Sequence, residues 1–219
     1  MTIRKSRIHT TGFTRVPAKT VEAARGLSSA TVHEAGGKIG VVPSGVKPVH
    51  SHFRVCGSVV TVHCPPGDNL WLHYAIYAAA PGDVIVAYCS GAFDHGYWGE
   101  VMSTAAKVRR LGGLVLDGCV RDFELLAQVD FPVFARGLCI RGTDKDRMAT
   151  GWVNEPISLE GLRVNHGDLV VGDCDGVVVV PQDRAVDVIA ASVSRDEQEL
   201  EICRRLMRGE RTLEIYALG

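Results

Sequence analysis

Short apolar segments alternate with amphipathic helical patterns in this chain, and no other feature restricts its fold as much. Segments 55–63 and 84–87 are rich in β-branched residues, and a helical pattern over 68–80 separates them. A second helical pattern, 100–110, leads into the apolar segment 114–116. Strand, helix and strand at this spacing predict parallel strands joined by crossover helices that cover the sheet.

The remaining segments extend this pattern into an α/β domain. We expect helices over 21–27 and 123–128, a Gly- and Ser-rich loop over 89–99, strands over 157–164, 169–171 and 177–180, and a long helix from 183 to about 208. No stretch resembles a linker between domains. We therefore predict one domain over residues 1–219, with an N-terminal arm over 1–19 and a C-terminal helix and tail over 183–219.

Charge and cysteine content exclude several classes of protein. The chain has 24 Lys and Arg against 25 Asp and Glu, so clustered positive charge for broad binding of nucleic acid or anionic membranes is not expected. Its apolar runs are far shorter than the ~20 residues that cross a bilayer. Seven cysteines without a C-x-x-C pair argue against a disulfide framework or a structural zinc site. We expect a cytoplasmic protein whose partners are small molecules.

The residues with the clearest chemical potential follow the apolar segment 114–116. Arg121 and Asp122 lie just beyond this predicted strand, and ligands of crossover folds bind beyond the carboxyl ends of strands. An arginine there can bind a carboxylate through two hydrogen bonds, and an aspartate can bind a hard cation such as Mg²⁺. An aspartate that enters a helix can instead be a simple helix cap, so Asp122 has a second interpretation.

Glu100 lies at the start of the helix that precedes this strand, with twenty residues between it and Arg121. Its loop should approach the same strand end, where its carboxylate could hold a metal through water. The free backbone amides of Val101 and Met102 in the first helical turn could bind an anion.

Several other polar residues are weaker candidates. His95 could contact a substrate carboxylate or serve in acid/base chemistry, or it could be a hydrogen-bonding loop residue. Asn69 could bind substrate or cap its helix. His50 and His52 alternate at a strand period and could bind adventitious metal, although a surface role suits them as well. Lys145 could add positive charge near the site or lie on a solvated loop.

An ordered set of motifs in this chain resembles one known family. They are Gly67-Asp68-Asn69, Pro81-Gly82-Asp83-Val84, Tyr97-Trp98-Gly99-Glu100, 114–122, 131–135, Arg141-Gly142-Thr143 and 167–181. The sequence resembles the family of regulator of ribonuclease activity A, and within it the class II pyruvate aldolases that act on 4-hydroxy-4-methyl-2-oxoglutarate and 4-carboxy-4-hydroxy-2-oxoadipate. The resemblance covers most of the chain from about residue 25. It implies an α-β-β-α sandwich with a swivelling-domain-like β core, assembled as a homotrimer or a dimer of trimers.

The resemblance also implies roles for the candidate residues. Asp122 would bind Mg²⁺ or Mn²⁺ directly, and Glu100 would do so through water. Arg121 would hold the pyruvate carboxylate together with the backbone around Glu100, which includes Gly99, Val101 and Met102. A further glutamate would reach the metal through water from the C-terminal helix of a neighbouring subunit, and Glu199 has the best register for it.

The implied activity is metal-dependent retro-aldol cleavage to pyruvate and a second 2-oxo acid, with oxaloacetate decarboxylation by the same chemistry and no lysine Schiff base. Two positions depart from the family pattern: Glu100 stands where an aspartate is usual, and Leu125 stands where an acid is usual, with Glu124 beside it. The alternative function is that of a non-enzymatic regulator that binds ribonuclease E, and the presence of Asp122 favours the enzyme. A demethylmenaquinone methyltransferase, an older label for the family, lacks support because the chain has no nucleotide-binding Gly-rich motif.

Overall fold

The computed structural model describes residues 14–219, so residues 1–13 of the predicted N-terminal arm lie outside the described residues. The described end of the arm packs on the body of the protein. The guanidinium of Arg15 forms two hydrogen bonds of 2.8 Å with the Asp83 carboxylate, and the amide of Val16 donates to Ser58 Oγ at 3.0 Å. Helix α1 (Ala18–Ala24) begins one residue before the predicted end of the arm.

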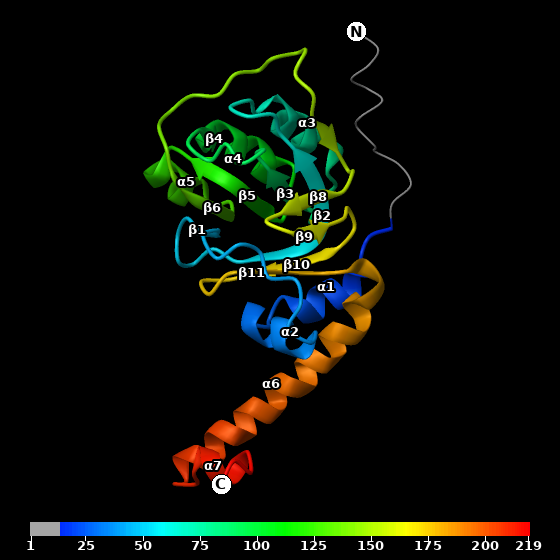
Figure 1. The fold of residues 1–219 in the computed structure, drawn as a ribbon, viewed down its shortest axis with the longest axis vertical. Coiled ribbons are helices and arrows are strands. Elements are labelled where there is room, and N and C mark those ends of the chain that lie inside the picture. Colours follow the sequence, from blue (N-terminus) through cyan, green and yellow to red (C-terminus); the bar gives the residue numbers. More distant parts are fainter. Residues whose placement is uncertain (1–13) are drawn as a thin grey trace.

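Four parallel strands form the centre of the fold, and the alternating pattern predicted the first three of them (Figure 1). They are β2 (Val55–His63), β3 (Val84–Tyr88), β5 (Gly113–Val120) and β6 (Val133–Leu138). The crossover helices that join them are α3 (Leu70–Ala78), α4 (Glu100–Val108) and α5 (Phe123–Val129). Most of the strand residues are buried, which is typical of parallel strands that are covered on both faces.

Antiparallel strands extend this sheet on both sides. The order is β1-β6-β5-β3-β2-β10-β11, with β4 paired to β5 and β7 paired to β2, so nine strands share one sheet. The added antiparallel strands are β1 (Lys47–Pro48), β7 (Trp152–Val153), β10 (Leu169–Gly172) and β11 (Val177–Val180). The short strand β4 (Gly96–Trp98) instead runs parallel to β5. Strands β8 (Ile157–Leu159) and β9 (Leu162–Val164) form a separate hairpin. The mixed α/β class is confirmed, while the likeness to a swivelling domain stays a prediction.

A second group of helices packs against β10 and β11, on the far side from α4 and α5 (Figure 1). It consists of α1, α2 (Ser29–Ala35) and the first turns of α6 (Ala185–Met207), which follows the short 3₁₀ helix η2 (Gln182–Arg184). Ser28 caps α2, because its Oγ accepts a 2.9 Å hydrogen bond from the Thr31 amide. The packing face comprises alternate strand residues such as Val171 and Val178.

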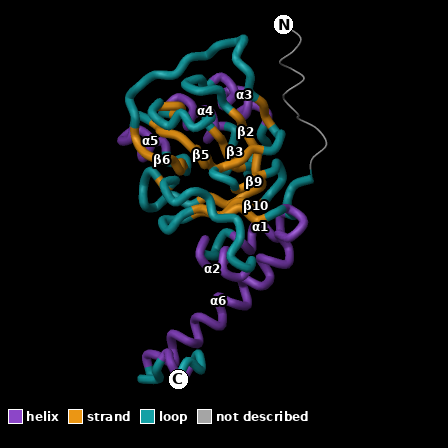
Figure 2. Tube along the Cα trace, viewed as in Figure 1, coloured by secondary structure: helices purple, strands orange, loops and turns teal. Residues whose placement is uncertain are grey.

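The predicted long C-terminal helix is confirmed, and most of it projects from the body (Figures 1 and 2). All its buried residues lie between Ala185 and Ser192. The short helix α7 (Thr212–Ile215) follows it. No helix within residues 14–219 is both long and apolar enough to cross a membrane.

Two local predictions were wrong. Residues 96–98, expected within a loop, form β4, because this segment pairs with the end of β5. Residues 50–52, expected to alternate along a strand, form a bend and turn before β2. In both cases long-range contacts outweigh the local pattern. His50 Nε2, for example, is 2.9 Å from the carbonyl oxygen of Phe123, which accepts its hydrogen bond.

Candidate active site

Arg121 and Asp122 lie at the carboxyl end of β5, where the sequence placed them. Strand β4 holds this end of β5 in position: Gly96 pairs with Cys119, Trp98 pairs with Val120, and the Arg121 amide donates to the Trp98 carbonyl at 2.9 Å. Because β4 directly precedes α4, this pairing brings the start of α4 beside the Arg-Asp pair.

The Asp122 carboxylate caps a helix other than its own. Asp122 occupies the N-cap position of α5, but it has left-handed backbone angles and its side chain caps no amide of that helix among the described residues. Instead, Asp122 Oδ2 accepts a hydrogen bond of 3.1 Å from the Glu100 amide at the N-terminus of α4. Arg121 Nε lies 3.9 Å from the same oxygen. The carboxylate therefore lies between a guanidinium and the positive end of a helix dipole.

Two glycines make this arrangement sterically feasible. A β-carbon on Gly99 would lie well within van der Waals contact of Asp122 Oδ2, so a side chain there would displace the carboxylate. A β-carbon on Gly96 would clash with the Cys139 carbonyl and crowd the Arg121 side chain. Sequence reasoning assigned Gly99 only to substrate binding and did not single out Gly96. Their spacing on either side of Tyr97-Trp98 was the available signal.

A cavity of about 220 Å³ adjoins the Arg-Asp pair. Its lining residues are Val120, Arg121, Asp122, Phe123, Leu138, Cys139 and Ile140. The Arg121 side chain is 48% exposed, so its guanidinium is available to an anion that enters from solvent. The exposed apolar side chains of Phe123, Leu138 and Ile140 form a wall that sequence reasoning did not anticipate. This wall joins the start of α5 to the end of β6, which lie fifteen positions apart in the chain.

The predicted backbone donors lie at the same place. Glu100, Val101 and Met102 form the first turn of α4, whose amides have no acceptor within the helix. The Glu100 amide is already used by Asp122, which leaves those of Val101 and Met102 as the anion-binding candidates. Asn69 is buried nearby, and its amide nitrogen donates to the Tyr97 carbonyl at 2.9 Å and contacts Met102 Sδ at 3.5 Å.

Asn69 does not cap α3 through its side chain, so the interpretation of Asn69 as a helix cap is wrong. Asp68 takes that role, since its Oδ1 accepts a 2.8 Å hydrogen bond from the Leu70 amide.

His95 packs its ring against Gly67 and lies 5.8 Å from the Tyr97 ring, and it is not among the residues that line the cavity. Burial raises the pKa of Tyr97 well above its usual range, so the Tyr97 hydroxyl stays protonated.

The other candidates lie apart from the cavity. Lys145 is exposed in the segment after β6, close enough to His73 to lower the pKa of that histidine, although burial is the larger cause. Glu199 lies on the projecting part of α6 and forms a 2.8 Å ion pair with Arg195. Within one chain Glu199 is therefore distant from Asp122, and its predicted role requires another subunit (Figure 1).

The donor set at Asp122 suits a hard divalent cation. Mg²⁺ commonly takes one or two carboxylates and keeps several waters. Asp122 offers its second oxygen, Oδ1, and Glu100 adds a carboxylate from the adjacent helix turn. No third metal-ligating side chain joins them in the described part of the chain, so the remaining positions would be filled by water or substrate.

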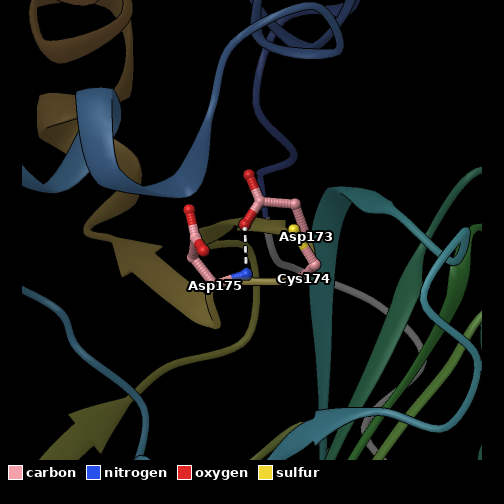
Figure 3. A group of neighbouring side chains, drawn as sticks. All are labelled: Asp173, Cys174 and Asp175. Atoms are coloured by element: carbon pink, nitrogen blue, oxygen red, sulfur yellow. Dashed lines mark hydrogen bonds between the residues drawn. The ribbon is translucent and has the colours of Figure 1, made fainter.

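A denser acidic cluster elsewhere has a structural explanation. Asp173, Cys174 and Asp175 form the turn between β10 and β11 (Figure 3). Both oxygens of Asp173 accept hydrogen bonds from Ser29, one from its hydroxyl at 2.7 Å and one from its amide at 2.8 Å, and the Asp175 amide donates to Oδ1. Asp173 therefore anchors α2 to the hairpin.

Comparisons with known proteins identify the family to which this chain is similar. The family described as RraA-like (Aldolase/RraA) matches residues 19–179. A Halalkalibacterium halodurans protein named as a candidate 4-hydroxy-4-methyl-2-oxoglutarate aldolase is 38% identical over 146 residues, which cover 67% of this chain and 69% of that protein. A Pseudomonas syringae structure of an uncharacterized protein has a TM-score of 0.79 and 27% identity, covering 91% of this chain and 97% of its own. The structure of a Streptomyces coelicolor member of the RNase ES inhibitor RraA family has a TM-score of 0.75 at 24% identity. The match covers 88% of this chain and 99% of that one.

Proposed function

Because the chain belongs to the RraA-like (Aldolase/RraA) family, we propose that it is a divalent-metal-dependent pyruvate aldolase, a carbon–carbon lyase. It would cleave a 4-hydroxy-2-oxo dicarboxylic or tricarboxylic acid to pyruvate and a second 2-oxo acid. The observation that carries this proposal is the Asp122 carboxylate, which lies beside Arg121 at the N-terminus of α4. The name of the 38% identical relative supports the same substrate class.

Arg121 and α4 are suited to hold the pyruvyl end of such a substrate. The half-exposed guanidinium would bind the C1 carboxylate, since planar guanidinium groups pair with carboxylates through two hydrogen bonds. The first-turn amides of Val101 and Met102 would add positive potential on the same side. Asp122 would hold Mg²⁺ or Mn²⁺ directly and Glu100 would hold it through water. When bound, the cation would polarise the C2 carbonyl as a Lewis acid.

The proton transfers follow from the bond that breaks. A base removes the proton of the C4 hydroxyl, the C3–C4 bond breaks, and its electron pair passes to C3, which then takes a proton to become the methyl group of pyruvate. We assign the base to a water molecule hydrogen-bonded to the Glu100 carboxylate. Loss of carbon dioxide from oxaloacetate leaves the same electron pair on C3, so the site would also decarboxylate oxaloacetate.

We further propose that the active unit is a homotrimer or a dimer of trimers. In this assembly Glu199 of a neighbouring subunit would approach Asp122 and contact the cation through water. The projection of α6 from the body supports this arrangement, because the exposed Glu199 is available to another subunit. Regulation of ribonuclease E is less well supported, since the likeness to the Streptomyces structure concerns the fold alone.

Pyruvate release tests the proposed function. Purified protein with Mg²⁺ or Mn²⁺ should release pyruvate from at least one of 4-hydroxy-4-methyl-2-oxoglutarate, 4-carboxy-4-hydroxy-2-oxoadipate and oxaloacetate. A chelator should abolish the release, and added metal should restore it. Comparison of the three rates would identify the preferred distal group. If none of the three acids yields pyruvate with either metal, the proposed function is wrong.

A further inference from the structure

A larger cavity lies at the opposite edge of the sheet from Arg121 and Asp122. It has a volume of about 420 Å³, within the range of small-molecule sites. Its lining residues are Arg25, Arg54, Val55, Cys56, Gly82, Arg110, Leu111, Gly112, Pro132 and Val171. Several of these directly precede the parallel strands β3, β5 and β6. The length of β5, eight residues at about 3.3 Å each, separates this cavity from the candidate active site by roughly 26 Å.

The charged side chains that line this cavity are all arginines. Arg25 and Arg54 each have an acidic neighbour: Arg25 Nε is 3.2 Å from Glu22, and Arg54 Nη2 is 3.8 Å from Asp173. Neither acid is among the lining residues. The Arg110 guanidinium has no ion-pair partner within residues 14–219, so its charge is not balanced by a neighbouring acid.

Asp83, an acid beside the lining residue Gly82, is paired with an arginine that is not among the lining residues. Asp83 follows Gly82 in the chain, and both of its oxygens are taken by the Arg15 guanidinium. The remaining polar side chain of the wall is the half-buried Cys56 thiol. Burial raises the pKa of Cys56 to about 11, so the thiol is neutral at physiological pH and adds no negative charge.

The backbone keeps the cavity open and places Arg110 at its edge. A β-carbon on Gly82 would meet no atom within 4 Å, whereas one on Gly112 would lie 2.7 Å from the Gly82 carbonyl oxygen. The floor therefore consists of closely packed backbone. Arg110 has a left-handed φ of 59°, which is costly for a residue with a side chain. The surrounding structure maintains this conformation, since the Gly82 amide donates to the Arg110 carbonyl at 2.8 Å.

We propose that this cavity binds a small multivalent oxyanion, a polycarboxylate or a phosphate-bearing molecule, through the guanidinium groups of Arg25, Arg54 and Arg110. Guanidinium groups form charge-assisted, two-point hydrogen bonds with both kinds of anion. Three of them around one cavity without a lining acid favour a ligand with at least two negative charges. The site is separate from the proposed active site and does not depend on a metal.

Isothermal titration of the full-length protein without added divalent cation tests this site. Citrate would represent polycarboxylates and inorganic pyrophosphate would represent phosphate-bearing ligands, and the tighter binder identifies the class. At least one should bind saturably. Arg110→Gln should weaken that binding about tenfold or more, because it removes a charge-assisted hydrogen-bond donor. Arg25→Gln should also weaken the binding without affecting the fold, because Arg25 is exposed and its ion pair among the described residues is a local one with Glu22.

Two control variants separate this site from other positive charge. Arg121→Gln removes the arginine of the proposed active site, and Arg163→Gln removes an exposed arginine on β9. Both should retain the saturable binding of the probe that Arg110→Gln and Arg25→Gln weaken. The proposal is overturned if neither probe binds saturably, if Arg110→Gln and Arg25→Gln both bind like wild type, or if Arg121→Gln abolishes binding.

Discussion

The backbone amide of Glu100 donates a 3.1 Å hydrogen bond to Oδ2 of Asp122, although twenty-one residues separate the two along the chain. This contact joins the start of α4 to the end of β5. It orients the carboxylate so that one oxygen faces the helix, and the other is available to a cation.

Asp122→Asn should abolish metal-dependent turnover and preserve the fold. The amide oxygen of asparagine can still accept from Glu100, but the neutral side chain is a poor ligand for a hard cation. We expect pyruvate release to fall by about a hundredfold or more, the scale on which loss of a positioned charged group acts, with a melting temperature near that of wild type. Glu124→Gln removes a neighbouring exposed acid and should keep its activity. Turnover by Asp122→Asn close to wild type would contradict the ligand assignment.

Gly99→Ala should damage the site by sterics alone. The added methyl group would overlap Asp122 Oδ2, so the carboxylate must move away from the Glu100 amide. Overpacking of this kind costs about 1–3 kcal/mol, and activity should be lost together with the hydrogen bond. Thermal melting and pyruvate assays measure the two effects. Gly26→Ala is the matched control, because a β-carbon on Gly26 meets no atom within 4 Å. If Gly99→Ala and Gly26→Ala have the same melting temperature and the same rate of pyruvate release, Gly99 has no steric role at the site.

His63 should make stability depend on pH. Burial lowers its pKa below the usual value of about 6.5. The ring stacks on Trp152 at 3.8 Å, Nε2 lies 3.0 Å from Ser90 Oγ, and Nδ1 is buried without an acceptor among the described residues. The unfolded chain therefore binds a proton at a higher pH than the folded chain does. Stability should be fully present above about pH 6.5 and fall as the pH drops toward the lowered folded value.

Melting temperatures of wild type and His63→Gln between pH 7.5 and pH 5 measure this effect. The variant cannot take up the proton, so wild type should lose stability relative to it as the pH falls. The difference in melting temperature between wild type and His63→Gln at pH 7.5 reports only the altered packing on Trp152. Parallel pH profiles of the two proteins would show that His63 does not contribute.

Mixed subunits can test the proposed role of Glu199. Asp122→Asn and Glu199→Gln should each be inactive alone, since every site lacks one acid. In a cyclic trimer assembled from equal amounts of both, about one site in four combines an intact Asp122 with an intact Glu199 from the neighbour. Refolding the variants together should therefore restore about a quarter of wild-type activity. If the mixture stays inactive while each variant assembles normally, Glu199 does not complete the site from another subunit.

Local pattern was sufficient for most of the fold. Apolar alternation and β-branched runs predicted three of the four parallel strands, their crossover helices and the long C-terminal helix, because these elements depend on side-chain periodicity. The crossover rule also placed Arg121 and Asp122 at a strand end. Wherever one element determines a residue's position, the sequence by itself was enough.

Only the tertiary structure decided how the site residues meet. Strand β4 exists because Gly96 and Trp98 pair with the end of β5, and no local propensity marks so short a segment. Because of the same pairing, the Asp122 carboxylate accepts a hydrogen bond from the Glu100 amide instead of capping its own helix. The arginines of the second cavity likewise come from segments more than eighty residues apart at the extremes. These features depend on contacts between distant segments, whose geometry sequence periodicity does not encode.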